Sequence, residues 1–402
     1  MISKNNRLVG AILLVSGTTI GAAMLALPVT TGLGGLGPSI AIMTVVWLFM
    51  LLTAFYLLEV NLRMKGESNI ISMVGKTLGR WGQIVSWLIY LLLLYSLIAA
   101  YMVGCSQILS DLFDPILTLT LPGWIWPVIL FVCFSCFIYF GTEAVDCINR
   151  PLMVGLAITF LSLIFMGLPH VKPALLQHVD WQHLLPSLAV VATTFGFHII
   201  IPTLTTYLEH DTRLLKRALF IGSLIPYILY VIWAILVMGI IPVIGSPSLN
   251  EAAATGMQVT FALKLILNNR WIGMATRGFA LFAIITSLLG VSLSLSDFLA
   301  DGFRIEKRSW GKPLVVLLTF IPPLLFTLFF PKGFVLALQY AGIFVIILLA
   351  LLPGCMVWKE RYGPETERSF VESDYKVAGG RFGVLATIVF SLILLAIEVY
   401  VL

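Results

Sequence analysis

Charged residues are scarce in this chain. Only 11% of its 402 residues are Asp, Glu, Lys or Arg, whereas 60% are apolar and the mean hydropathy is +1.04. Soluble domains carry about 25% charged residues. A water-soluble fold of this composition would leave large apolar patches in contact with water. The scarcity of charge therefore excludes an ordinary soluble protein and predicts a chain that lies in a lipid bilayer.

Motifs of enzymes and metal centres are also lacking. The five cysteines offer a single C-x-x-C pair, Cys133 and Cys136, whereas a metal site of that type usually needs a second pair. Neither H-E-x-x-H nor G-x-S-x-G occurs. Basic residues are not interleaved with aromatic ones, so nothing predicts a nucleic-acid partner. We therefore expect no enzyme, metal or cofactor, and we assign the cysteines to helix packing.

Long apolar runs are what the chain has in abundance. A membrane-spanning helix requires about 20 predominantly apolar residues, which is more than the strands of an outer-membrane barrel contain. The first run has no convincing signal-peptide cleavage site, so it is interpreted as a retained helix. The sequence predicts one all-α integral membrane domain over residues 1–402. Its eleven spans are expected near residues 8–30, 39–62, 82–109, 124–140, 151–169, 184–208, 218–241, 274–300, 314–330, 334–357 and 382–402.

Lys and Arg are distributed unevenly among the connecting segments. If the N-terminus is cytoplasmic, 19 of the 24 basic residues lie in cytoplasmic segments and five lie outside. Cytoplasmic loops of membrane proteins are enriched in Lys and Arg. We therefore predict a cytoplasmic N-terminus and, with eleven spans, a C-terminus on the outer side.

Two predicted spans contain helix-breaking sequences at matching places. The first carries Gly17–Gly21 and then Pro28, and the sixth carries Thr193–His198 and then Pro202. These spans begin the two halves of a 5+5 inverted repeat, about residues 8–169 and 184–357, with 382–402 as an extra helix. Paired interruptions at membrane depth are typical of the binding site of inverted-repeat transporters. The alternative is that the glycines serve close helix packing and the shared T-T-x-G is a coincidence.

The ends of the interrupted helices suit a zwitterion. One half-helix is expected to end near Ser16 and Gly17 and another near Thr193 and Thr194, where free carbonyl groups favour an ammonium group. The outer half of the first span begins near Gly21, where free N–H groups favour a carboxylate. An α-amino acid presents both charges close together, so we expect an amino-acid substrate.

Two ionisable side chains inside the spans are candidates for ion coupling. His198 follows the second interruption, and either proton coupling, binding of the substrate ring or a neutral structural role fits this position. Asp297 shares one face of the eighth span with Ser287, Gly290 and Ser294, at spacings of three and four residues. This stripe is either a pathway for substrate or ion, or a close-packed helix interface.

Aromatic residues follow one face of the third span. Tyr90 and Tyr101 lie there together with Trp87, Leu94 and Leu97. Such a face is suited to an aromatic side chain, because aromatic rings prefer stacked or edge-to-face contacts. Packing inside the helix bundle is the other interpretation.

Several of these segments resemble the bacterial aromatic amino-acid permeases, and the tyrosine-specific members most closely. The resemblance covers nearly the whole chain and includes the eleven spans. It implies the LeuT-type fold of the amino acid–polyamine–organocation superfamily, a multi-pass location in the bacterial inner membrane with a periplasmic C-terminus, and proton-coupled uptake of tyrosine, phenylalanine or tryptophan. Residues 199–201 depart from the family pattern, which has a small residue after the histidine, and this departure bears on substrate choice. The matching segments are Gly17–Pro28, Thr194–His198, Leu295–Asp301, Phe320–Pro323 and Gly333–Gly342.

We therefore predict a secondary active transporter that imports aromatic amino acids, tyrosine first, by proton symport and alternating access. A carrier for another neutral amino acid, a Na⁺-coupled carrier, and a nutrient sensor or channel remain as alternatives. The expected partners are the amino acid, H⁺ and the lipid bilayer. The predicted coupling residues are His198 and Asp297. The predicted substrate-binding residues are Gly17, Thr18, Thr19, Ile20, Gly21, Tyr90, Tyr101, Thr194, Phe195, Gly196, Phe197, His198 and Ser294.

Overall fold

The structure is a computed structural model that describes residues 4–64, 68–117, 122–256, 258–306, 310–363 and 375–401. Within these ranges every regular element is a helix. Nine of the described helices are long and apolar enough to span a bilayer, and a bent pair, Asn6–Thr19 with Ala22–Gly34, makes a tenth. Helix α5 (Ile125–Phe140) has 16 residues and is shorter than these spans. The predicted all-α membrane architecture is confirmed, whereas a count of eleven spans depends on α5.

Helix α1 (Lys4–Thr19) ends in the middle of the first apolar run. The 3-10 helix η1 (Ala22–Leu25) begins two residues later, and Gly21 between them has an extended backbone (φ −151°, ψ −172°). Helix α2 (Leu27–Thr31) and the 3-10 helix η2 (Gly32–Gly34) continue the chain, and the two parts of the run are bent by 51°. Pro28 lies in the first turn of α2, where its missing N–H has no intrahelical partner to lose.

The sixth apolar run is divided in a similar way. It consists of the 3-10 helix η5 (Gln182–Ser187), α7 (Leu188–Thr194), the 3-10 helix η6 (Phe197–Ile200) and α8 (Ile201–Tyr207). Phe195 (φ −111°, ψ 26°) and Gly196 (φ −80°, ψ 38°) lie between α7 and η6 with non-helical backbone angles.

The other spans are long helices joined by shorter elements. Helix α4 begins well before the predicted residue 82, because a helical segment precedes a kink at Gly79 (φ 83°). The π-helix η7 (Ile346–Leu351) joins α14 (Phe334–Val345) to α15 (Leu352–Tyr362) in one span. The remaining long helices are α3 (Leu36–Leu62), α4 (Ile70–Leu117), α6 (Thr142–Gly167), α9 (Thr212–Ile240), α12 (Arg270–Phe303), α13 (Gly311–Phe329) and α16 (Gly380–Val401). The short connecting helices are η3 (Leu168–His170), η4 (Pro173–Gln177), α10 (Leu249–Thr255) and α11 (Val259–Leu267).

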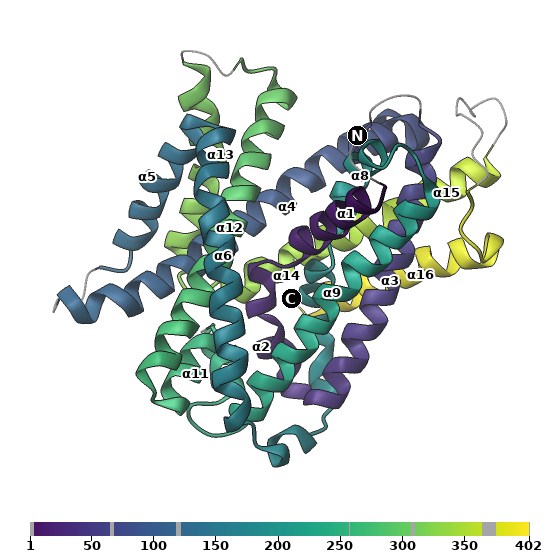
Figure 1. Cartoon of the computed structure of the whole chain (residues 1–402). Coiled ribbons are helices and arrows are strands. Elements are labelled where there is room, and N and C mark those ends of the chain that lie inside the picture. The colour runs from purple at the N-terminus through teal and green to yellow at the C-terminus, as the bar shows by residue number, and fades with distance from the viewer. Residues whose placement is uncertain are drawn as a thin grey trace.

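The interrupted segments lie between two groups of helices. Figure 1 shows α5, α6, α12 and α13 on one side of the molecule and α1, α3, α9, α15 and α16 on the other. Helix α1 packs against α9, α7 packs against α14, and α14 packs in turn against α4. Helix α12 packs against both α4 and α6. The helix ends at the two interruptions are therefore surrounded by protein.

The outer faces of the helices suit lipid. On α6, Val154, Ile158, Leu161 and Phe165 are between 53% and 74% exposed. A soluble protein rarely leaves so large an apolar face in water. These side chains are therefore expected to contact the acyl chains of a bilayer.

Candidate functional site

The two interrupted runs bring the ends of two helices together. The hydroxyl of Tyr230, on α9, donates a hydrogen bond to the carbonyl oxygen of Thr19 (2.7 Å) and lies 3.3 Å from the carbonyl oxygen of Thr194. Thr19 is the last residue of α1, and Thr194 is the last residue of α7. One buried hydroxyl therefore reaches the C-terminal ends of both half-helices.

The charge at this meeting point favours a positive group. The C-terminal end of a helix carries a partial negative charge of about half an electron. A phenol has one proton to donate, so the Thr194 carbonyl, at the longer distance, keeps capacity for another donor. An ammonium group supplies three donors and a full positive charge.

The second half of the first run is fixed to α12. The backbone N–H of Ala22 donates to the Ser287 hydroxyl (3.1 Å), which donates in turn to the carbonyl of Ala283 (2.8 Å). A Cβ atom at Gly21 would lie only 3.1 Å from the Ser287 hydroxyl oxygen, so glycine permits this approach. Ser287 thus already satisfies one of the N–H groups that we expected to face a carboxylate.

A cavity of about 580 Å³ lies beside the interruptions. Small-molecule sites commonly have volumes of about 300–1,000 Å³. The structure therefore brings together the first interruption, two residues of the second, two tyrosines of α4 and a predicted serine of α12. The predicted site residues that line this central cavity are Gly17, Thr18, Thr19, Ile20, Gly21, Tyr90, Tyr101, Gly196 and Ser294.

Helix α4 supplies a mostly apolar wall to the central cavity. Tyr90 packs edge-on against Phe298 of α12, with ring centroids 4.9 Å apart. Trp87, the other aromatic residue of the predicted stripe, stacks on Phe298 at 5.2 Å and is not part of the cavity lining. The lining residues of α4 are Tyr90, Leu93, Leu94, Leu97 and Tyr101.

The central cavity extends toward the face of the molecule that carries the N-terminus. Leu13 and Leu14, which precede the interruption in α1, line the cavity and are 64% and 43% exposed. Asn149 and Met153 of α6 and Thr203 of α8 complete this part of the lining. A ligand at the interruptions would therefore have a route to the N-terminal face.

Four predicted site residues lie behind the wall of the cavity. Thr194, Phe195, Phe197 and His198 are at most 1% exposed, and none of them lines the cavity. The Phe195 ring packs edge-on against Tyr230, with centroids 5.5 Å apart. These side chains hold the second interruption in place from behind.

The ring of His198 is directed toward α3. Its Nε2 atom lies 2.9 Å from the Thr53 hydroxyl oxygen, and that hydroxyl donates to the carbonyl of Met50 (3.0 Å). Because the Thr53 proton is already used, Nε2 carries the hydrogen of this contact. Nδ1 has no hydrogen-bond partner among the described residues. His198 therefore connects the second interruption to α3, and the hydrogen-bond pattern fits a neutral ring.

The polar stripe of α12 enters the cavity along only part of its length. Ser287, Gly290 and Ser294 line the cavity. Asp297 and Asp301 lie further along the helix, are exposed and are not part of that lining. Among the described residues, no group of three or more His, Cys, Asp or Glu is placed to hold a metal ion.

Sequence reasoning missed the contribution of α9. Tyr230 reaches the carbonyls of both interruptions, and Trp233, three residues later, donates to the carbonyl of Met24 in η1 (3.2 Å). Two aromatic donors three residues apart on an apolar helix share one face, and this spacing was the available signal. Asn149 and Met153 of α6 had no comparable signal in the sequence.

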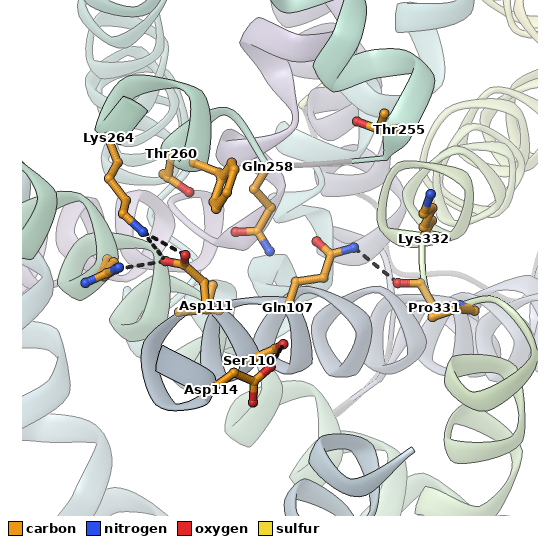
Figure 2. Close-up of a pocket in the computed structure, with 13 residues that line it drawn as sticks. Gln107, Ser110, Asp111, Asp114, Thr255, Gln258, Thr260, Lys264, Pro331 and Lys332 are labelled. Atoms are coloured by element: carbon orange, nitrogen blue, oxygen red, sulfur yellow. Dashed lines mark hydrogen bonds and ion pairs between the residues drawn. The ribbon is translucent and has the colours of Figure 1, made fainter. Parts of the chain in front are cut away.

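A second cavity, of about 650 Å³, lies near the other end of α4 (Figure 2). Figure 2 shows the Asp111 carboxylate paired with the Lys264 ammonium, at distances of 2.7 and 3.0 Å. The Arg277 guanidinium donates to the same carboxylate at 2.8 Å. Gln107 donates to the carbonyl of Pro331 (3.2 Å), and Gln258 donates to that of Gly104 (2.8 Å). These contacts fasten α11 and α12 to α4.

A packed layer separates the two cavities. Tyr101 lines the central cavity and Gln107 lines the second one, so the cavities follow each other along α4 at a spacing of about 9 Å. Gly104 lies between them, and a Cβ atom there would be 3.0 Å from atoms of Gln258, Ile284 and Phe334. The central cavity is therefore closed on the side that faces away from the N-terminus.

Comparisons with known proteins find matches over nearly the whole chain. Residues 4–398 match the tryptophan/tyrosine permease family. The tyrosine-specific transport system 1 of Haemophilus influenzae is 33% identical over 399 residues, which cover 98% of this chain and 96% of that protein. The tryptophan-specific transport protein of the same organism is 30% identical, over 97% of this chain and 95% of its own length. The crystal structure of MhsT in complex with L-phenylalanine shares the fold, with a TM-score of 0.60, 15% sequence identity and 98% of each chain covered.

Proposed function

Because the chain belongs to the tryptophan/tyrosine permease family, we propose that it imports aromatic amino acids, tyrosine first, by proton symport. As a member of that family it is a transmembrane amino-acid permease and not an enzyme. The observation that carries the proposal is the central cavity. There the carbonyl ends of two half-helices meet beside an apolar wall that contains Tyr90 and Tyr101.

In this proposal the backbone binds the part of the substrate that all amino acids share. The substrate ammonium takes the free capacity of the Thr194 carbonyl and lies beside the Thr19 carbonyl, which Tyr230 holds in place. The carboxylate lies near Gly21 and the beginning of η1, next to Ser287. The aromatic ring lies against the α4 wall, opposite Gly196 and Ser294.

We place this site in an eleven-span, LeuT-type arrangement in the bacterial inner membrane. The two repeats cover about residues 8–169 and 184–357, α16 is the extra helix, and the N-terminus is cytoplasmic with a periplasmic C-terminus. The similar division of the first and sixth runs and the shared fold with MhsT support this proposal. In this orientation the central cavity of the structure is open to the cytoplasm.

Proton coupling is assigned to His198 and Asp297. The position of His198 supports this assignment, because its ring joins the second interruption to α3. Any change in its charge would act on the hydrogen bond to Thr53 and so on the second interruption. Asp297 follows Ser294 by one turn on α12 and is exposed, so it is available for exchange with water at the cavity mouth.

The second candidate is a carrier for another neutral amino acid, or an amino-acid carrier that is coupled to Na⁺ instead of H⁺. Recognition through helix ends is the same for every α-amino acid, and the hydroxyl groups of Thr286 and Ser287 beside the first interruption are ligands that Na⁺ accepts.

Uptake of labelled L-tyrosine into proteoliposomes tests the proposal, with an imposed proton gradient, a Na⁺ gradient or neither. Saturable accumulation with the proton gradient alone is the expected result. Accumulation that requires Na⁺ would favour the second candidate, and non-saturable or absent flux would favour a channel or a sensor.

A further inference from the structure

Helix α16 lies outside both proposed repeats, yet it carries a fully buried carboxyl group. Glu398, near its C-terminal end, is 0% exposed. Its Oε1 atom accepts a hydrogen bond of 2.6 Å from the backbone N–H of Ala189, in the first turn of α7. Its Oε2 atom has no hydrogen-bond partner among the described residues.

Among the described residues, no charged side chain of the neighbouring elements is paired with Glu398. Helix α16 packs against η5, α7, α14, η7 and α15. Its Phe390 also contacts Phe49 of α3, whose Tyr56 and Glu59 lie near the other end of α16. His183 of η5 pairs with Asp180 and its side chain is 61% exposed, and Tyr340 of α14 is 42% exposed. Neither α7 nor η7 contains a titratable residue.

The charged groups of α15 lie at the other end of α16. They include Glu360 and Arg361, and Arg361 contacts the carbonyl of Val377, just before α16 begins. Glu398 lies about 27 Å further along the helix axis. On α16 itself Arg381 is also at that distant end, and Tyr400 is 91% exposed.

Both forms of the Glu398 carboxyl have a source of stabilisation. The hydrogen bond from the Ala189 amide favours the ionised form. The surrounding apolar helices disfavour a charge and favour the protonated form. A group between two such influences is suited to binding and releasing a proton.

Helix α7 connects this carboxyl group to the substrate site. The carbonyl of Ala189 accepts a hydrogen bond from the Thr193 hydroxyl (2.9 Å), and Thr193 lines the central cavity. On the other side, a Cβ atom at Gly342 of α14 would lie 2.2 Å from the Ala189 carbonyl oxygen, so α14 touches the backbone of this turn directly. A displacement of the first turn of α7 is therefore transmitted to the interruption one turn later.

We propose that Glu398 is a proton-binding site that links the driving proton to the position of α7. The proton binds Oε2 and converts the carboxylate to a carboxylic acid, which weakens the hydrogen bond from the Ala189 amide in the first turn of α7. Release of the proton restores the charge and the stronger hydrogen bond. The inference rests on the proposed proton symport and adds to it a binding group in the helix outside the repeats.

The test compares Glu398→Gln with the wild type and with Ser391→Ala in proteoliposomes. Gln keeps the size and hydrogen-bonding groups of a protonated Glu, whereas Ser391 is another fully buried polar residue of α16, hydrogen-bonded to Thr387. We expect Glu398→Gln to keep tyrosine exchange, to lose accumulation driven by the proton gradient, and to make uptake independent of the outer pH. Ser391→Ala should retain all three properties of the wild type.

Two outcomes overturn the inference. One is a Glu398→Gln protein with the wild-type pH profile and the wild-type number of protons per tyrosine, measured with a pH indicator in lightly buffered vesicles. The other is an equal loss of exchange in Glu398→Gln and Glu398→Asp. The Asp variant still carries a carboxyl group, so a proton-binding role requires it to differ from the Gln variant and to retain pH dependence. A wild type that ignores the proton gradient would reject the symport itself, which is a distinguishable result.

Discussion

Tyr230 shows how much one side chain contributes at the residue scale. Its hydroxyl contacts the last carbonyl of α1 and approaches that of α7, and it is 1% exposed. Without that hydroxyl, two partially negative helix ends would face each other with no donor between them. Tyr230 therefore fixes the geometry into which the substrate ammonium has to fit.

Tyr230→Phe is predicted to weaken tyrosine binding about 5- to 30-fold, because the ends of α1 and α7 lose the hydrogen bond that holds them in position for the substrate ammonium, a loss of about 1–2 kcal/mol. The measurement is the KM for tyrosine uptake and the Kd in detergent. Tyr227→Phe is the matched control, since its hydroxyl contacts Thr44 one turn earlier on α9 and does not reach the interruptions. Equal KM values for the two variants would contradict the role given to Tyr230.

His198 lies in η6, next to the second interruption, and the direction of its ring could not be predicted from the sequence. A regular helix advances about 100° per residue, so the direction of every side chain follows from one of them. Phe195 and Gly196 have non-helical backbone angles, so the directions of the side chains after them no longer follow from those before. The structure turns His198 to α3, whereas Thr193 and Gly196 of the second interruption line the cavity.

His198→Gln is predicted to retain tyrosine exchange and to lose accumulation driven by the proton gradient. Gln donates a hydrogen bond to Thr53 as the ring does, but it does not titrate in the working range. Exchange and net accumulation are measured on the same proteoliposomes. Full accumulation in both His198→Gln and His198→Ala, at normal protein levels, would leave the histidine with a structural role alone.

Salt bridges at the N-terminal face illustrate the element scale, because they join helices that are distant in sequence. The Arg361 guanidinium of α15 donates to both carboxylate oxygens of Glu59 on α3 (2.8 and 2.6 Å). The Glu59 side chain is fully buried, and it also accepts from the N–H of Val377 (2.7 Å). This network fixes α15 and the segment before α16 to α3.

Arg361→Gln is predicted to destabilise the protein by about 3–5 kcal/mol, because it leaves the buried Glu59 carboxylate without its main partner. Thermal unfolding in detergent measures the change. Arg7→Gln is the control: it removes the ion pair with Glu209, whose side chain is 71% exposed, and is expected to leave the unfolding temperature unchanged. Similar melting curves for the two variants would show that the Glu59 network contributes little.

The elements themselves were predictable to different degrees. Every predicted apolar run is helical, the first and the sixth in several pieces, because about 20 apolar residues have few other ways to satisfy their backbone in a bilayer. The short helices η3, η4, α10 and α11 were not predicted, since they are too short for a clear hydrophobic period. The helical segment before Gly79 was not predicted. A single glycine in the sequence does not reveal that the chain is kinked there and that helix α4 extends to both sides of the kink.

At the scale of the whole molecule, the described residues leave the central cavity accessible from one face. It extends to Leu13, Leu14 and Met153 on the N-terminal side, and the layer around Gly104 closes it on the other side. A transporter that alternates access is expected to expose the same residues to each face in turn. The structure corresponds to the state that is open toward the N-terminus.

Ser294→Cys tests this accessibility in a chain whose five native cysteines have been replaced. Ser294 is exposed and lines the cavity, so a membrane-impermeant thiol reagent applied from the N-terminal face is expected to label it quickly, and saturating tyrosine to slow the reaction. A cysteine at Ser391, which is 0% exposed, is the unlabelled control. Fast labelling from the opposite face alone, unaffected by tyrosine, would contradict this placement of the site.

The account as a whole depends on one claim, that the central cavity selects an aromatic amino acid. The direct measurement is competition for labelled L-tyrosine uptake into proteoliposomes that carry an imposed proton gradient, with each unlabelled amino acid added in turn. Backbone recognition at the helix ends is common to all of them, so selectivity has to come from the α4 wall with Tyr90 and Tyr101. We predict strong competition by tyrosine, phenylalanine and tryptophan and little by alanine, lysine or glutamate. Equal competition by alanine would contradict the claim.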